Sequence, residues 1–207
     1  MTNKIKVLLV DDHAVYRMGL IALLDTEPDI EVVGEAEDGK NALRKAAKLS
    51  PDVVVMDLMM PVMDGITATR EFRQQLPSVK ILILTTSSTS DDLANALRCG
   101  ATGAITKNDA TSKLVAAIRA VAAGHESVSS EIRRLIADDP PIPELSPRQL
   151  EILQSITRGL TTPDIAKQLG ISTESVKMHS SILFEKLGAS NRTEAVAIAL
   201  RKHLLKI

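Results

Sequence analysis

Carboxylates follow two apolar runs of the chain at the point where each run ends. Asp57 comes directly after V-V-V-M, and Asp11 and Asp12 come directly after I-K-V-L-L-V. Such runs are typical of buried parallel strands, and the carboxyl ends of neighbouring parallel strands meet at one edge of a sheet. Three carboxylates in one pocket repel one another unless a cation lies among them, and oxygen ligands suit Mg²⁺. We therefore expect a magnesium site at this edge, although without Asp57 the acid pair could instead mark a helix start, with Asp12 or His13 as the cap of a helix that begins near Ala14.

A hydroxyl and an ammonium group are predicted at the same edge. Thr85 ends the apolar run I-L-I-L, and Lys107 follows the short run A-I-T. These groups could hold a phosphoryl group on Asp57, because the ammonium and Mg²⁺ would neutralise its oxygens and the threonine would donate a hydrogen bond to one of them. The side chains at this edge together predict a phosphoacceptor site at Asp57.

The elements that must position these residues alternate along the first 124 positions. Alternation of strands and helices predicts a parallel sheet with helices on both faces, since right-handed crossovers permit little else. Strands are predicted near residues 5–10, 30–35, 52–57, 79–85 and 102–106, and helices near residues 14–25, 39–49, 65–75, 90–99 and 111–123.

The order and spacing of these motifs resemble the receiver domain of two-component response regulators. The shared features are the acid pair after the first strand, D-L-x-M-P-x-x-D-G beginning at Asp57, the threonine after the fourth strand and the lysine after the fifth. The resemblance implies a flavodoxin-like (βα)5 receiver with strand order 2-1-3-4-5. It also implies phosphorylation of Asp57 by a sensor histidine kinase or an acyl phosphate, with Mg²⁺ bound by Asp12, Asp57 and the carbonyl of Met59, and by Asp11 through water.

One position departs from the receiver pattern. Relatives usually have an aromatic residue three positions before the lysine, where this chain has Ala104. The coupled movement of a threonine and an aromatic ring therefore cannot operate in its usual form. Either Thr85 suffices for switching, or the signal runs through contacts between domains.

Residues 125–144 are predicted to form a linker that contains a short helix near residues 128–137. Three prolines fall within residues 140–143, which favours an extended, stiff chain. We therefore predict a receiver domain over residues 1–124, the linker, and a second domain over residues 145–207. The second domain carries nine lysines and arginines against five acidic residues, a bias that suits a partner rich in phosphates.

The second domain is predicted to be all helical. Ser146 opens a capping box with proline at the first helical position, and Asn191 opens another. Between them, Thr162 starts a helix, Gly170 ends it and Ser172 starts the next, which is the pattern of a helix-turn-helix. A four-helix bundle without a role in DNA binding would have a similar composition.

The motifs of this domain resemble the LuxR-type C-terminal domain of NarL/FixJ response regulators. The resemblance implies an α/β receiver joined to an all-α, four-helix domain that binds DNA and regulates transcription. It is carried by L-S-P-R-Q-L-E-I-L at 145–153, G-L-T-T-P-D-I-A-K-Q-L-G-I-S at 159–172, S-V-K-M-H at 175–179 and L-G-A-S-N-R-T-E-A at 187–195.

Helical periodicity divides the predicted recognition helix into two faces. Val176, Ser180, Leu183 and Leu187 share the face expected to pack on the core. The other face is expected to enter the major groove, with Lys177 reaching a phosphate or guanine and Met178 a thymine methyl group. Ile182 lies on its flank, where relatives often have asparagine, and His179 is interpreted as structural. The remaining groove residues are Glu174, Ser181 and Glu185, and the candidates for DNA-backbone contacts are Arg148, Arg158, Lys167, Lys186 and Arg192.

The last predicted helix is apolar all round, so one side can pack on its own domain while the other meets a second chain. Val196, Ala199 and Leu200 are the predicted dimer contacts. The predicted active form is a homodimer that binds an inverted repeat in double-stranded DNA. A sensor histidine kinase and RNA polymerase are the other expected partners.

Composition excludes several other classes of protein. Aromatic residues make up only 1% of the chain, too few for stacking single-stranded bases or for the bulky pocket of a ligand-sensing LuxR regulator. A hydrolase with an aspartyl-phosphate intermediate is the other alternative, and it would need a cap domain for which no sequence is left; we expect no enzyme acting on a separate substrate. A single cysteine, Cys99, and the lack of a signal peptide or an apolar run of membrane-spanning length indicate a cytoplasmic protein without membrane contact.

Overall fold

The computed structural model describes residues 4–86, 89–202 and 204 of the 207-residue chain. The chain divides into two compact units, residues 1–140 and 141–207. Each unit has a buried core of its own and is described by itself. Among the residues described, no helix combines the length and the apolarity needed to cross a membrane.

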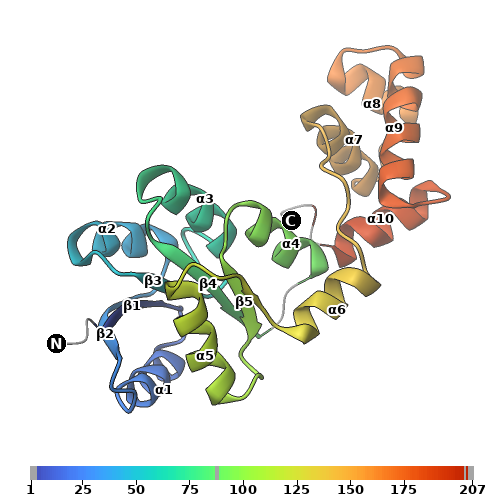
Figure 1. Cartoon of the computed structure of the whole chain (residues 1–207). Helices are drawn as coiled ribbons and strands as arrows, with labels where there is room; N and C mark the ends of the chain where they lie inside the picture. The colour runs from blue at the N-terminus through green and yellow to red at the C-terminus, as the bar shows by residue number, and fades with distance from the viewer. Residues whose placement is uncertain (1–3, 87–88, 203, 205–207) are drawn as a thin grey trace. The chain divides into compact units, whose positions relative to one another are not determined.

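Six parallel strands form the sheet of the first unit (Figure 1). Their order is β2-β1-β3-β4-β5-β6, which confirms the implied order of the first five strands and adds a sixth at the edge. The central strands form because their β-branched and aliphatic residues are covered on both faces. The bounds are Ile5–Val10 (β1), Ile30–Ala36 (β2), Val53–Met56 (β3), Lys80–Thr85 (β4), Gly103–Thr106 (β5) and Ser127–Val128 (β6).

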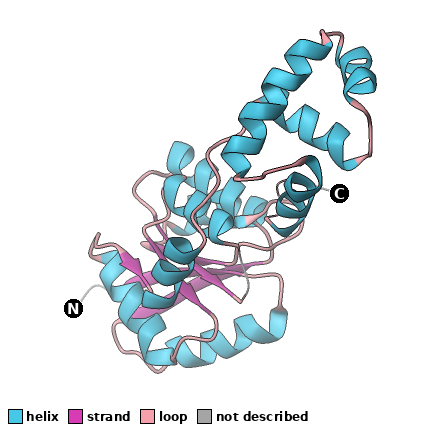
Figure 2. Cartoon of the chain, turned by 90° about the vertical axis from the view of Figure 1, so that its right-hand side faces the viewer, coloured by secondary structure: helices cyan, strands magenta, loops and turns pink. Residues whose placement is uncertain are grey.

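Helices cover both faces of this sheet (Figure 2). Successive strand residues point to opposite faces, so Leu8 lies in one buried cluster and Leu9 in the other. The first cluster is covered by α2, α3, α4 and α6, and the second by α1 and α5. The bounds are Ala14–Leu24 (α1), Gly39–Leu49 (α2), Gly65–Gln75 (α3), Ser90–Arg98 (α4), Thr111–Ala122 (α5) and Ser130–Asp138 (α6).

Residues 125–140, predicted as most of the linker, belong to the first unit. β6 pairs with β5, and the backbone N–H of Ser129 donates to the Ala104 carbonyl at 2.9 Å. Ile132 on α6 is fully buried in the cluster that contains Ala104, and Ser90 Oγ donates to Asp139 Oδ2 at 2.9 Å. The prediction of a linker over 125–144 is corrected for a physical reason: the apolar residues of α6 need cover, and the edge of the sheet provides it.

Four helices form the second unit, as predicted: Pro147–Thr157 (α7), Thr162–Leu169 (α8), Thr173–Leu187 (α9) and Arg192–Arg201 (α10). Ile152, Ile165 and Leu183 meet in its core. Gly170 ends α8 with φ +64°, a left-handed conformation that glycine adopts without a steric cost. The turn between α8 and α9 therefore has the form expected of a helix-turn-helix.

The helix caps of this unit are mostly those expected. Ser146 and Gln149 form a reciprocal capping box at α7. The box at α10 is only half formed, because Asn191 accepts from the N–H of Glu194 while the Glu194 carboxylate accepts from the N–H of Ser190. The helix register is nevertheless the predicted one.

Candidate functional site

The carboxylates of Asp11 and Asp57 lie side by side at the carboxyl edge of the sheet. Val10 and Met56 are register partners in β1 and β3, which places the next residue of each strand at the same level. Both side chains are almost completely buried, Asp11 at 3% and Asp57 at 4% exposure. Two buried carboxylates whose oxygens lie within 4.8 Å of each other require a cation. The structure supplies one from the residue directly after β5.

Lys107 provides that cation. Its Nζ donates to Asp57 Oδ2 at 2.7 Å and also to Asp11 Oδ2, while its backbone N–H donates to the Thr85 carbonyl at 2.8 Å. Burial alone would lower the pKa of Lys107, but the hydrogen bonds to Asp11 and Asp57 outweigh it and hold the pKa above its usual value. Thr85, also buried, ends the neighbouring strand. The structure thus brings together four of the residues that the sequence placed at this site.

Asp12 and His13 form the exposed side of the same cluster. Ligand atoms of Asp11, Asp12, His13 and Asp57 all lie within 4.8 Å of one another, and His13 Nδ1 lies 2.7 Å from Asp12 Oδ1. α1 begins at Ala14 with His13 at the N-cap position, one of the two caps considered, although its side chain makes no capping hydrogen bond; Asp12 does not cap the helix. His13 was not predicted to be a site residue, and its position directly after the two aspartates was the available signal.

Met59 lies in the loop after β3 and is exposed. Its backbone N–H donates to Asp57 Oδ1 at 3.3 Å, which helps to orient the carboxylate. The role of its carbonyl as a metal ligand stays a prediction. Gly65, at the start of α3, closes the loop by donating to the Leu58 carbonyl at 2.9 Å, and a Cβ at this glycine would lie 2.3 Å from the Asp57 carbonyl oxygen.

α6 lies beside Thr85, the residue expected to move on phosphorylation. Thr85 lines a cavity of about 240 Å³ together with Leu93, Thr106, Ile132 and Leu135. Ala104 and Ile132 belong to one buried cluster, and the Ala104 carbonyl accepts from the N–H of Ser129, the N-cap residue of α6. The small residue at position 104 therefore lies on the strand to which the start of α6 is attached.

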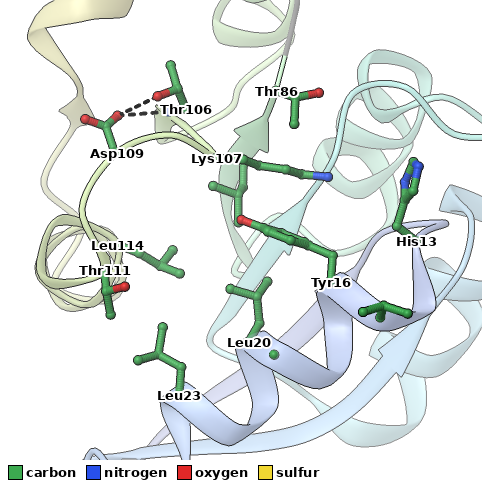
Figure 3. Close-up of a pocket in the computed structure, with 13 residues that line it drawn as sticks. His13, Tyr16, Leu20, Leu23, Thr86, Thr106, Lys107, Asp109, Thr111 and Leu114 are labelled. Atoms are coloured by element: carbon green, nitrogen blue, oxygen red, sulfur yellow. Dashed lines mark hydrogen bonds between the residues drawn. The ribbon is translucent and has the colours of Figure 1, made fainter.

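A larger hollow, of about 670 Å³, adjoins the site between α1 and α5 (Figure 3). Leu20, Leu23 and Leu114 form much of its apolar wall. Tyr16 faces Lys107, whose Nζ lies 4.5 Å from the centre of the ring, so the ring adds a cation–π contact to the ammonium. The sequence contained no pattern that predicted this hollow.

The second unit presents the predicted recognition face to the surface. Glu174, Lys177, Met178, Ser181 and Glu185 on α9 are all exposed. Val176, Leu183 and Leu187 on its opposite face are buried, and Ser180 and His179 are half-buried. Lys167 on α8 is exposed as well.

Three of the predicted contact residues make contacts within the second unit, and a DNA contact of Arg192 or Lys186 stays a prediction. The Arg192 guanidinium donates to the carbonyl of Ile156, in the last turn of α7, and to that of Leu160, in the loop after α7. Lys186 Nζ donates to the Glu144 carbonyl at 2.7 Å and to Gln149 Oε1 at 3.1 Å. Ala199, a predicted dimer contact, is fully buried in the core of its own unit, where α10 packs on α7 and α9.

Two candidates for the dimer contact stay accessible. Leu200 is exposed, and Val196 is half-buried against the core. Their role in pairing remains a prediction.

Comparisons with known proteins agree with this architecture. The family model of the response regulator receiver domain matches residues 7–119, and that of bacterial regulatory proteins of the luxR family matches residues 143–199. The chain is 39% identical to the transcriptional regulatory protein LiaR of Bacillus subtilis (strain 168), over 97% of this chain and 99% of LiaR.

Solved structures give the same result. The RcsB response regulator of Salmonella typhimurium has a TM-score of 0.73 at 27% identity, covering 94% of this chain and 98% of RcsB. A structure of two RcsB dimers bound to two parallel DNAs has a TM-score of 0.70 at 28% identity, and the match covers 97% of this chain and 99% of that chain. The chain therefore belongs to the two-component response regulators that join a receiver domain to a LuxR-type helix-turn-helix domain and regulate transcription.

Proposed function

We propose that reversible phosphorylation of Asp57 controls homodimerisation and sequence-specific DNA binding by the second unit. The observation that carries this proposal is the convergence of Asp57, Asp11 and Lys107 at the carboxyl edge of the sheet. A buried nucleophilic carboxylate with an ammonium 2.7 Å from one oxygen is suited to accepting a phosphoryl group.

The residues of the site fit a divalent cation. Asp11, Asp12 and Asp57 supply three carboxylates against one ammonium, and their converging oxygens suit Mg²⁺. When bound, Mg²⁺ would neutralise these carboxylates and the oxygens of an incoming phosphoryl group. Asp12 is exposed, so a hydrated ion can reach the site from solvent.

The Asp57 carboxylate is the nucleophile of the proposed reaction. One of its oxygens attacks the phosphorus of a kinase phosphohistidine or of an acyl phosphate. The new Oδ–phosphorus bond forms as the bond to the donor breaks, and the electron pair leaves on the donor nitrogen or oxygen. Lys107 then transfers its hydrogen bond to a phosphoryl oxygen, and Thr85 donates another.

α6 is proposed to transmit the change. Thr85 lines the cavity that Ile132 and Leu135 of α6 cover, so movement of Thr85 toward a phosphoryl group would alter the surface under α6. α6 ends at Asp138, two residues before the prolines that lead into the second unit. Its displacement would therefore reach the DNA-binding domain directly through the chain.

The second unit is proposed to bind an inverted repeat in double-stranded DNA as a homodimer. The exposed face of α9 and the likeness to RcsB dimers bound to DNA support this proposal. Leu200 and Val196 are the proposed dimer contacts, and Lys177 and Lys167 the proposed cationic contacts with DNA. A cognate sensor histidine kinase and RNA polymerase are the remaining proposed partners.

The test is incubation of the full chain with radiolabelled acetyl phosphate and Mg²⁺. Wild type should incorporate label, and Asp57→Asn should not, because it lacks the nucleophile. Asp25→Asn, at an exposed aspartate after α1, is the matched control and should label like wild type. Equal labelling of wild type and Asp57→Asn, or no labelling of wild type, would refute the phosphoacceptor assignment.

A further inference from the structure

Two large apolar side chains stand on the exposed face of α9. Met178 is 56% exposed and Ile182 is 41% exposed, although Val176 and Leu183 of the same helix are buried. The two are four positions apart, so they lie one above the other on one side of the helix. They form an apolar strip, Met178 and Ile182, between the polar residues Lys177 and Ser181.

The proposed position of α9 in the major groove restricts what this strip can contact. Base edges in that groove present hydrogen-bond donors and acceptors, except for the C5-methyl group of thymine. An apolar side chain pressed against a donor or acceptor leaves that group without a partner, which is costly. Phosphates are an even poorer surface for it. The thymine methyl group is the one large apolar feature that suits Met178 and Ile182.

The spacing of the strip fits more than one base. Four residues of α-helix advance about 6 Å, and successive bases of one strand are about 3.4 Å apart along the duplex axis. When the helix axis runs near the groove direction, Met178 and Ile182 therefore face bases one to two steps apart. Lys177 and Glu174 remain beside the strip for polar contacts, both of them exposed.

We propose that Met178 and Ile182 read the C5-methyl groups of two thymines, adjacent or one base apart, in each half-site. This inference rests on the proposed binding of DNA by the second unit and adds which chemical feature of the DNA that helix recognises. Ile182 is then a determinant of sequence specificity. Apolar contacts of Met178 and Ile182 with thymine methyl groups take the place of some of the hydrogen bonds to base edges by which such a helix recognises its sequence.

The experiment uses the full chain, treated with acetyl phosphate and Mg²⁺, and a randomised duplex library from which bound sequences are selected. Each thymine of the selected half-site is then replaced by uracil, which removes only the methyl group. Wild type should lose affinity about fourfold at each of two thymines, the effect of one methyl-sized group.

The variants assign each methyl group to a side chain. Met178→Gln keeps an unbranched chain of similar length, and Ile182→Thr keeps the branch at Cβ; each should abolish the uracil effect at its own thymine and leave the other. Met18→Gln, at a methionine 60% exposed on α1, is the matched control and should retain both effects. Ile182→Val should retain the uracil effect in part.

The outcomes separate this inference from the function on which it rests. If a site is selected but uracil and thymine probes bind equally, or if the variants keep the wild-type uracil effects, the reading of methyl groups is refuted while DNA binding stands. If no duplex is selected from the library, the DNA-binding proposal fails and this inference fails with it. Uracil effects that disappear equally in Met18→Gln would also refute it.

Discussion

The phosphoacceptor site and the recognition face of α9 differ in where the contacts of their side chains come from. At the first, Asp11, Asp57 and Lys107 are buried and bonded to one another. At the second, Met178 and Ile182 are exposed, and their contacts must come from another molecule. The comparison teaches that the receiver site is built by the fold itself, whereas the recognition face is completed only by its partner.

The two regions should therefore contribute differently to the stability of the protein. Substitutions at the phosphoacceptor site should change the free energy of unfolding, because partners inside the protein are lost. Substitutions on the recognition face should leave it nearly unchanged and alter binding instead.

The largest effect is expected from Lys107→Met. Removing the ammonium leaves Asp11 and Asp57 buried without their cation, so the free energy of unfolding of the first unit should fall by about 3–5 kcal/mol. Added Mg²⁺ should restore part of the loss, because it compensates the same carboxylates. Urea unfolding with and without Mg²⁺ measures both.

Lys113→Met is the matched control for this prediction. Lys113 is exposed, and its partner at 2.7 Å, the Asp109 carboxylate, also accepts two hydrogen bonds from Thr106, so loss of Lys113 should cost clearly less than loss of Lys107. Equal losses for the two variants would break the distinction between a buried lysine and one at the surface.

Ile132→Ala tests whether α6 is part of the receiver. Ile132 is fully buried, and its truncation should cost about 2–5 kcal/mol through lost burial and a cavity. The N–H of Ser129, bonded to Ala104, should then exchange with solvent faster. Thermal unfolding and hydrogen exchange are the measurements.

Leu135→Ala, at a leucine of the same helix that is 39% exposed, should cost clearly less. If Ile132→Ala is no more destabilising than Leu135→Ala, α6 behaves as a linker after all.

Arg192 and Lys177 were both predicted from the sequence to contact DNA. Their alanine variants test whether each side chain contributes to stability or to DNA binding. Arg192→Ala should destabilise the second unit by about 1–3 kcal/mol, because the carbonyls of Ile156 and Leu160 lose a charged donor. Lys177→Ala should change its unfolding by less than about 0.5 kcal/mol. Urea unfolding of both variants measures the difference.

The affinity for DNA should show the reverse order, with a larger loss in Lys177→Ala than in Arg192→Ala. A phosphate contact from Lys177 would reduce the salt slope of binding by about one, and a base contact would relax sequence preference. Unchanged affinity, slope and preference in Lys177→Ala would show that the recognition face is misassigned.

Leu200→Ser should have the smallest effect on stability. Leu200 is exposed, so the monomer should unfold as wild type does, within about 0.5 kcal/mol. Pairing on DNA should weaken, seen as loss of cooperative binding to a site with two half-sites. Cooperative binding at the wild-type level would remove Leu200 from the dimer contact.

The sequence predicted most of this architecture because strong local signals agreed with the overall topology. Apolar runs marked the strands of the receiver, and residues such as Asp57 and Lys107 follow strands whose ends must meet at one edge. β6 escaped prediction because two residues, Ser127 and Val128, are too short to show a period. α6 was found as a helix, but only the structure shows that Ile132 packs on the sheet.

One predicted dimer contact fails because Ala199 was placed by helix periodicity, whereas the core of its own unit buries it completely. Arg192 was placed at the DNA by residue type, and only the structure shows that its guanidinium also bonds the carbonyls of Ile156 and Leu160. Tyr16 was missed because its contact with Lys107 joins distant parts of the chain and has no pattern in the sequence, whereas His13 could have been found from its position next to Asp12.

The most direct test of the account is the affinity of the full chain for its selected duplex before and after treatment with acetyl phosphate and Mg²⁺. Wild type should bind more tightly and more cooperatively after treatment, and Asp57→Asn should be unaffected. An equal response from both proteins, or no response from wild type that has been shown to carry label, would contradict the control of DNA binding by Asp57.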